Sequence, residues 1–285
     1  MEYIVSLLVL AGLYVILSSS FNLIIGYCGL MSVAHPIFFA FGAYTAGLLA
    51  IHADINPVLA VLAGGLVAVV MSTMISLPSL RISGDYLMIT SIGFQLAFLE
   101  VIKNIDAVGG GSGLSNIPNT ISGDGRSATF AVLACGTALL VVLLIRWLVN
   151  GPYGRVITAM RDDELAFAAI GRNAMRIKVS IFAIGSGIAG IAGGIYAYYY
   201  QYLTPEKFAV HETTAILTMV VVGGMGSVWG PAVGAVLLLA LPQLITFVNL
   251  PEGLMASLQS MIFSSLVLLF LFLRPQGLFG PTKRG

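Results

Sequence analysis

The chain has 285 residues, of which 58% are hydrophobic and only 9% charged, and its mean hydropathy is +1.00. This composition is typical of an integral membrane protein and excludes an ordinary water-soluble domain. The formal net charge of +1 gives no reason to expect nucleic acid as a partner. The lipid bilayer is therefore the first partner that we predict.

Nine apolar stretches follow one another along the chain. A hydrocarbon core about 30 Å thick needs roughly 20 apolar residues per helix. Their apolar character is continuous, without the alternation of barrel strands, so we predict an all-α polytopic bundle of about nine transmembrane helices in one domain, residues 1–285. The stretches are Ile4–Ile25, Val33–Ile51, Pro57–Leu77, Tyr86–Ile102, Ala128–Ile145, Val179–Tyr202, Val210–Val222, Val228–Val248 and Leu254–Leu273.

The basic residues predict how this bundle is oriented, because Lys and Arg accumulate on the cytoplasmic side of short loops. With the N-terminus outside and the C-terminus inside, ten of the 13 basic residues fall on the cytoplasmic side. Only Lys103, Arg126 and Lys207 fall outside. Residues 103–127 then form an external Gly-rich loop, and residues 151–178 form a cytoplasmic loop. Whether the short segment 210–230 spans or re-enters the membrane stays open.

The familiar enzyme motifs are missing. No lysine directly follows a glycine, so a Walker A loop is excluded. The sequence from His211 to Ala215 begins like a zinc-binding HExxH pattern but ends on alanine. Cys28 and Cys135 are isolated, which predicts neither a disulfide nor a CxxC site. We therefore expect a chain that is not an enzyme, with no metal site and no cofactor of its own.

Ionisable residues inside a membrane often mark ion or proton paths. Asp85, Glu100, His211 and Glu212 fall near the ends of the predicted helices, where they can reach headgroups or water. This placement weakens the hypothesis of an ion-coupled carrier. Five tyrosines crowd the predicted outer end of the sixth stretch, where they either anchor the helix at the bilayer interface or shape an external substrate vestibule. They are Tyr196, Tyr198, Tyr199, Tyr200 and Tyr202.

Small residues indicate how the helices pack. Gly185, Ala189 and Gly193 recur at intervals of four, as do Gly190 and Gly194. In lipid, small residues allow close backbone approach, so this pattern predicts a tight helix interface. The run from Gly223 to Pro231 disfavours continuous helix and is interpreted as a cytoplasmic turn or as a break that lines the transport pathway.

The segment from Gly151 to Lys178 holds eight charged residues in an otherwise apolar chain. We predict two short helices there, the first from about Tyr153 to Met160 and the second N-capped by Asp162, with Gly171 as its C′ glycine. Helices this short are marginal alone and need a docking surface. The apolar positions predicted to provide it are Val156, Met160, Leu165, Phe167 and Ile170. From the residues alone, the segment either caps the chain's own bundle or contacts a partner.

Several ordered blocks of sequence resemble the permeases of bacterial branched-chain amino acid ABC importers. The longest block runs from Gly154 to Gly194 and looks like their coupling loop and following helix. The blocks around the SGDYL and VGGGSGL sequences look more like the M-type permease of the pair than the H-type. The family commonly has other residues at Ala34, Pro36 and Thr204, which puts the substrate in doubt more than the fold. The other blocks are Asn22–Leu49, Leu80–Phe94, Thr204–Phe208, Met219–Ala235 and Leu273–Gly280.

The resemblance implies ATP-driven import of leucine, isoleucine, valine or a similar amino acid across a bacterial or archaeal cytoplasmic (inner) membrane. The implied partners are a second, H-type permease subunit, two cytosolic ATPases that bind ATP and Mg, and a periplasmic or lipid-anchored binding protein. Three alternatives stay open: the same machine carrying urea, amides, nucleosides or sugars, an ion-coupled carrier, and a purely structural membrane subunit with no pathway of its own. Substrate-binding residues are not identified. The residues to which the resemblance gives the coupling role are Gly154, Arg155, Ala159, Arg161, Asp162, Asp163, Glu164, Ala168 and Gly171.

Overall fold

The computed structural model describes residues 2–53, 55–80, 85–119, 125–246, 261, 264, 265, 268, 272 and 277–280. Within this part of the chain the regular structure is helical, apart from an isolated bridge between Leu114 and Leu203. The α-helices are α1 Glu2–Asn22, α2 His35–Ala53, α3 Pro57–Ser79, α4 Asp85–Lys103, α5 Arg126–Asn150, α6 Pro152–Asp162, α7 Glu164–Ala169, α8 Ala174–Tyr200, α9 Val210–Gly223 and α10 Gly230–Thr246. The shorter elements are the π-helix η1 Leu23–Tyr27 and the 3₁₀ turns η2 Asp106–Val108, η3 Gly110–Ser112 and η4 Pro205–Phe208.

Six helices are long and apolar enough to cross a membrane: α1 with η1, α2, α3, α4, α5 and α8. The helices α9 and α10 are apolar but shorter. The predicted all-α membrane fold is thus confirmed. The stretch Leu254–Leu273 lies mostly outside the described residues, so the count of nine stays a prediction.

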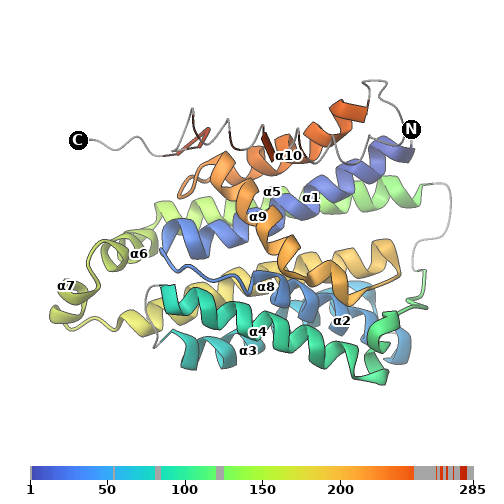
Figure 1. The fold of residues 1–285 in the computed structure, drawn as a ribbon, viewed down its shortest axis with the longest axis horizontal. Coiled ribbons are helices and arrows are strands. Elements are labelled where there is room, and N and C mark those ends of the chain that lie inside the picture. Colours follow the sequence, from blue (N-terminus) through green and yellow to red (C-terminus); the bar gives the residue numbers. More distant parts are fainter. Residues whose placement is uncertain are drawn as a thin grey trace.

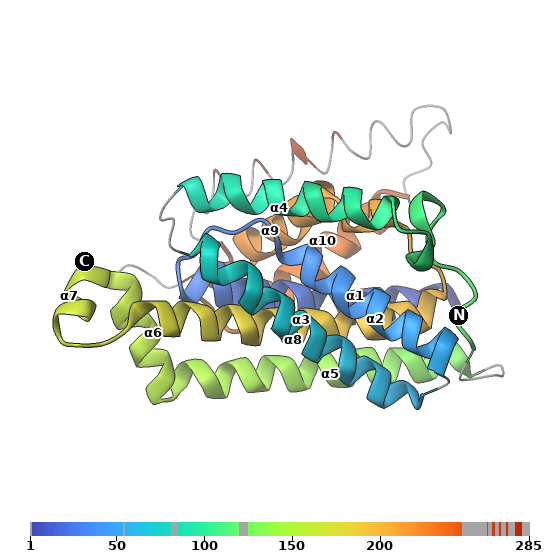
Figure 2. The same ribbon diagram turned by 90° about the horizontal axis from the view of Figure 1, so that it is seen from below.

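The bundle has a central and a peripheral set of helices. In α8, 72% of the apolar window is buried within the chain, and in α1 and α2 the share is 61%. In α3 and α4 the share is only 28%, and in α5 it is 39%. The helices α4 and α5 lie on opposite sides of the bundle with α8 between them (Figures 1 and 2). The exposed apolar sides of these outer helices are suited to lipid or to another subunit.

Small residues bring the backbones of α2, α3 and α8 into close contact. A Cβ atom on Gly42 would lie 2.0 Å from the carbonyl oxygen of Gly190, and one on Gly193 would lie 2.1 Å from that of Phe39. Ala189, on the same side of α8, is fully buried. The predicted tight interface is confirmed, and through it α8 packs closely against both α2 and α3.

The two ends of the bundle differ. The helices α6 and α7 project from one end, here called the hairpin end, whereas the start of α1 and the connection from α4 to α5 lie at the opposite end (Figure 1). This arrangement separates the predicted cytoplasmic loop, 151–178, from the predicted external loop, 103–127.

The helix α9 begins inside the bundle. After α8, the chain pairs with the α4–α5 connection through Leu203 and Leu114 and then turns through η4. The first turn of α9 contacts Tyr14, which lies halfway along the 26-residue span Glu2–Tyr27. After 14 residues α9 ends at Gly223, beside the end of α1. Segment 210–223 therefore covers only part of the bundle's length.

Candidate coupling loop and buried polar cluster

The helix α6 starts directly after α5 at a sharp corner. Pro152 occupies its first turn, where a missing N–H costs nothing. At Gly154 the backbone passes so close to α5 that a Cβ atom would lie 1.7 Å from the carbonyl oxygen of Val149. Ile157 and Met160 bury the inner side of α6, and the helix continues to Asp162. It is therefore longer at both ends than the predicted range of Tyr153 to Met160.

The N-cap of α7 is Asp163, not Asp162 as predicted. Because α6 continues through Asp162, the first extended residue is Asp163, with φ −152° and ψ 100°. Its carboxylate accepts a hydrogen bond from the amide of Ala166 at 2.9 Å. The C′ glycine is confirmed, since Gly171 has φ +77°, a conformation that favours glycine.

An ion pair fastens α7 to α8. The Nζ atom of Lys178 lies 2.6 Å and 2.7 Å from the two carboxylate oxygens of Glu164. The Lys178 side chain is only 10% exposed, whereas that of Glu164 is 51% exposed. Glu164, which was predicted to meet a partner, thus already has a partner within the chain.

Replacing Glu164 by glutamine is expected to loosen this hairpin, because it leaves the buried Lys178 ammonium without its carboxylate. We expect a loss of about 1–3 kcal/mol, below the value for a fully buried pair because the carboxylate is half exposed. Limited proteolysis between α6 and α8 in membranes would measure the loosening. The double variant Glu164→Gln, Lys178→Met should regain much of the resistance. Equal susceptibility of Glu164→Gln and the unmodified chain would contradict the assignment.

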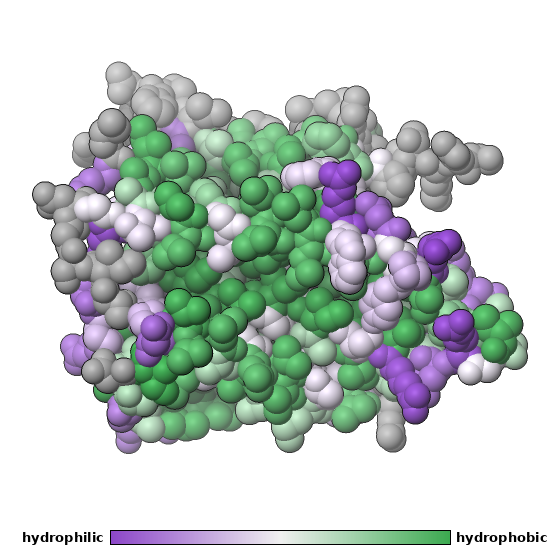
Figure 3. Space-filling view, turned by 180° about the vertical axis from the view of Figure 1, so that it is seen from behind, coloured by the Kyte–Doolittle hydropathy of each residue, from purple (hydrophilic) through white to green (hydrophobic). Residues whose placement is uncertain are grey.

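The proposed docking surface is smaller than predicted. Met160 and Phe167 are buried within the chain, at 2% and 5% exposure, and stabilise the hairpin itself. Leu165 and Ile170 remain 84% and 74% exposed. Hydrophilic residues surround an apolar tip at the hairpin end (Figure 3). Of the predicted coupling residues, Gly154 is buried and the others are exposed: Arg155, Ala159, Arg161, Asp162, Asp163, Glu164, Ala168 and Gly171.

Arg161 connects the hairpin to the bundle. It donates a hydrogen bond from its Nη1 atom to the carbonyl oxygen of Gly26, in η1, at 2.8 Å. Its aliphatic stem packs so close to Gly29 that a Cβ atom there would lie 3.2 Å from its Cγ. Cys28 lies between Gly26 and Gly29 in the sequence. Burial raises the pKa of its thiol to about 12, which keeps the thiol neutral at physiological pH. Cys28 and Cys135 are both free, as predicted.

Asn22, at the end of α1, extends this junction to the loop between α9 and α10. Its side-chain amide donates to the carbonyl oxygen of Ser227 at 2.8 Å and accepts from the amide of Gly226 at 2.9 Å. The amides of Leu278 and Phe279 donate to carbonyl oxygens at the end of α9. The run from Gly223 to Pro231 is thus a turn that joins several elements at the hairpin end.

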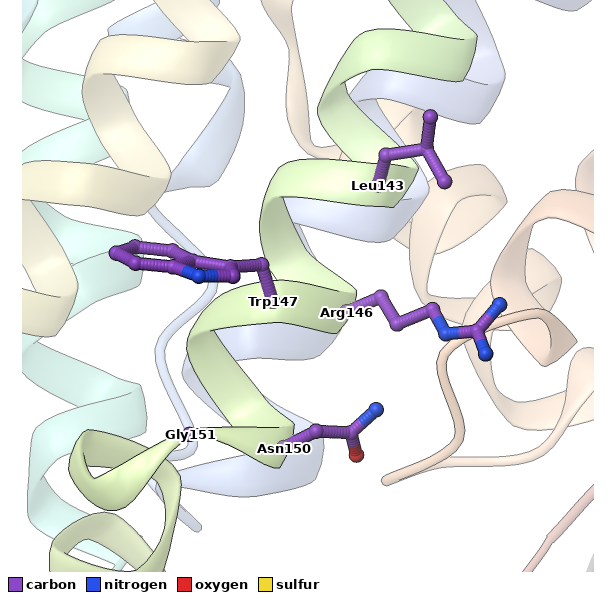
Figure 4. Close-up of a pocket in the computed structure, with 5 residues that line it drawn as sticks. All are labelled: Leu143, Arg146, Trp147, Asn150 and Gly151. Atoms are coloured by element: carbon purple, nitrogen blue, oxygen red, sulfur yellow. The ribbon is translucent and has the colours of Figure 1, made fainter.

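A shallow groove of about 370 Å³ lies where α5 meets α6. Arg146 and Trp147 point to opposite sides of α5, and Leu143 and Asn150 lie on the side of Arg146 (Figure 4). Trp147 is 75% exposed, which suits an aromatic residue at a bilayer interface. The groove is open and has one cationic side chain in its lining, so it does not enclose a ligand.

A polar cluster lies inside the bundle, away from the hairpin. The hydroxyl of Tyr14 donates a hydrogen bond to Glu212, whose side chain is only 12% exposed. The Nζ atom of Lys207 lies 4.0 Å from the same carboxylate, and the Lys207 side chain is 42% exposed. Glu212 is in the first turn of its helix, as expected, but that helix begins at mid-depth. The prediction that it reaches headgroups or water is therefore wrong.

A hydrogen-bonded network holds the two charged residues of this cluster in place. The Nε2 atom of Gln95, in α4, donates to the carbonyl oxygen of Phe208 at 3.0 Å. The same side chain bonds with the hydroxyl of Thr213, at 3.1 Å and 3.2 Å. Because Phe208 follows Lys207 and Thr213 follows Glu212, the network fixes both backbones relative to α4.

Comparison with known proteins agrees with the sequence resemblance. A family model described as branched-chain amino acid transport system / permease component matches residues 3–273. The high-affinity branched-chain amino acid transport system permease protein LivM of Escherichia coli (strain K12) is 31% identical, covering 98% of this chain and 70% of its own length. A probable LivM protein of Methanocaldococcus jannaschii is 30% identical, covering 94% and 90%. The Escherichia coli LivH permease is 23% identical, covering 95% and 92%. No solved structure matches.

Proposed function

Because the chain belongs to the permease family of branched-chain amino acid transport systems, and to its LivM type, we propose that it carries leucine, isoleucine, valine or similar amino acids across a cytoplasmic membrane. The observation that carries this proposal is the match over nearly the whole chain, from residue 3 to residue 273. The six long apolar helices support the role of a multi-pass transport subunit. In this role the N-terminus faces outward and the hairpin end faces the cytosol.

The complete machine in this proposal has four further proteins. A LivH-type permease supplies the other half of the pathway, two cytosolic ATPases bind ATP and Mg, and an external binding protein delivers the amino acid. The similarity of the chain to both LivM and LivH supports the pairing of two related permeases. The α6–α7 hairpin, which projects from the bundle and leaves Leu165 and Ile170 exposed, is the part that we propose meets an ATPase.

Coupling then requires that ATP-driven closure of the ATPases moves the hairpin and, through it, the bundle. Arg161 supports this step because it joins α6 to η1. The Gly154 corner and the Glu164–Lys178 pair fasten the hairpin to α5 and α8. A movement of the hairpin would therefore act on three of the long helices: α1 through η1, α5 and α8.

The proposal is tested by reconstituting this chain with its second permease, the ATPases and the binding protein in proteoliposomes. We expect uptake of radiolabelled leucine that requires ATP and the binding protein and persists with a protonophore. Omitting this chain alone should reduce uptake to the background of empty vesicles. Uptake that collapses with the protonophore while ATP remains would instead indicate an ion-coupled carrier.

A further inference from the structure

The cluster of Tyr14, Glu212 and Lys207 lies where a membrane protein rarely keeps charge. Tyr14 is halfway along the first span, so the carboxylate bonded to it is near mid-depth. Charged side chains at this depth are costly and usually mark a substrate or ion pathway. The network of Gln95 and Thr213 holds the cluster in place and leaves the Glu212 carboxylate to Tyr14 and Lys207.

The surroundings of the cluster are otherwise apolar. Leu10, Leu13 and Leu17 share one side of α1 and line a small space together with Phe39 and Tyr196. The space has room for about one water molecule, so an amino acid could bind here only after side chains around it move apart. Lys207, on η4 next to the loop end of α8, is the more exposed member. Access therefore leads from the end opposite the hairpin.

We propose that this cluster is a transient binding site for a zwitterionic α-amino acid on its way through the permease. Glu212 takes the α-ammonium group, Lys207 takes the α-carboxylate, and the leucine-rich side of α1 takes the aliphatic side chain. This assignment rests on the proposed function and names the residues with which that function would recognise its substrate.

Charge balance supports a zwitterion as the occupant. The ion pair of Lys207 and Glu212 has no net charge, so a ligand with no net charge can separate it and pair with both halves. An anion bound to Lys207 would leave the buried Glu212 carboxylate without a cation, which is strongly unfavourable in an apolar site, and a cation bound to Glu212 would leave the half-exposed Lys207 unpaired. The 4.0 Å separation is already at the limit of an ion pair, and the long lysine stem can move outward.

The tyrosines at the end of α8 agree with this position of the entrance. Tyr196 and Tyr198 are buried, at 7% and 4% exposure, and Tyr196 lines the small space. Tyr200 and Tyr202 are 41% and 48% exposed. Interface anchoring thus fits the two exposed tyrosines, whereas Tyr196 and Tyr198 pack inside the bundle and Tyr199 packs against Phe130 of α5.

The test measures equilibrium binding to the purified importer complex in nanodiscs without its binding protein, both nucleotide-free and trapped with ATP and vanadate. The probes are leucine, 4-methylpentanoate, which lacks the ammonium group, and isopentylamine, which lacks the carboxylate. Glu212→Gln should weaken leucine roughly tenfold but should not weaken 4-methylpentanoate, because a charge-assisted hydrogen bond is lost only with leucine. Lys207→Met should weaken leucine similarly and should not weaken isopentylamine.

Glu206→Gln is the matched control, since it neutralises an exposed acid on the same turn as Lys207 and should leave all three probes unchanged. The proposal is overturned if Glu212→Gln leaves leucine binding intact, or if it weakens all three probes equally, as a purely structural role would. It is also overturned if a complex that transports leucine never binds it in either state. Failure of the unmodified complex to transport leucine would instead count against the proposed function.

Discussion

Replacing Leu165 by aspartate is expected to detach the ATPases from the importer while leaving the permease folded and inserted. Leu165 is 84% exposed at the tip of the hairpin, so the change disturbs no packing within the described chain. In the complex, the aspartate would be a charge without a partner inside an apolar contact, which costs about 3–5 kcal/mol. Co-purification of the ATPases with a tagged permease should therefore fall by roughly a hundredfold or more.

The matched control for this variant is Leu165→Met, which keeps an apolar side chain of similar volume and should retain the ATPases. Ile170→Asp, 74% exposed on the same tip, should behave like Leu165→Asp. If both aspartate variants retain a normal ratio of ATPase to permease, the hairpin tip is not the docking surface.

The tip is a cleaner target than the acidic residues beside it. Reversing Asp163 would remove the N-cap of α7, and reversing Glu164 would place two cations side by side at Lys178. Either variant would disturb the hairpin itself, so loss of coupling would have two explanations. Because Asp163 and Glu164 stabilise the hairpin, Leu165→Asp is the substitution that tests ATPase docking without disturbing the fold of the hairpin.

Local patterns predicted much of the fold. Continuous apolar stretches predicted the long helices because a membrane span depends on length and composition, both of which a sequence states directly. The spacing of Gly185, Ala189 and Gly193 predicted close helix packing for a similar reason, since residues four apart share one side of a helix. The C′ position of Gly171 was also predictable, because left-handed backbone favours glycine.

Features that depend on distant contacts were not predictable in the same way. The sequence places Glu212 at a helix end, and the structure agrees. Its position along the length of the bundle, however, depends on where η4 and Gln95 place the start of α9. Nothing in the sequence signals that Tyr14, 198 positions away, would donate to it. The choice of Asp163 over Asp162 as N-cap depended on how far α6 continued, which is set by the burial of Ile157 and Met160 against the bundle.

The hydrogen bond between Arg161 and Gly26 also joins residues far apart in sequence. Because Gly26 belongs to η1, a movement of the hairpin would move η1 as well. A π-helix is rare and often lies at a functional site. The adjoining Asn22 side chain connects to Gly226 and Ser227, so a shift of η1 reaches the α9–α10 loop as well. The ends of α1, α6 and α9 at the hairpin end of the bundle therefore form one connected junction around Arg161.

Replacing Arg161 by glutamine is accordingly expected to uncouple the importer. The shorter, neutral side chain cannot reach the Gly26 carbonyl in the same way, so the hairpin can move without moving η1. In proteoliposomes we expect leucine uptake to fall roughly tenfold, the effect of losing one charge-assisted hydrogen bond, while ATP hydrolysis changes less than twofold. Arg176→Gln, which neutralises an exposed arginine in the first turn of α8 and outside the predicted coupling residues, is the matched control and should retain both activities. If the ATPases still dock but the contact between Arg161 and Gly26 is lost, uptake should fall while ATP hydrolysis continues. Parallel loss of uptake and hydrolysis in Arg161→Gln would contradict this prediction and would show that Arg161 supports ATPase docking.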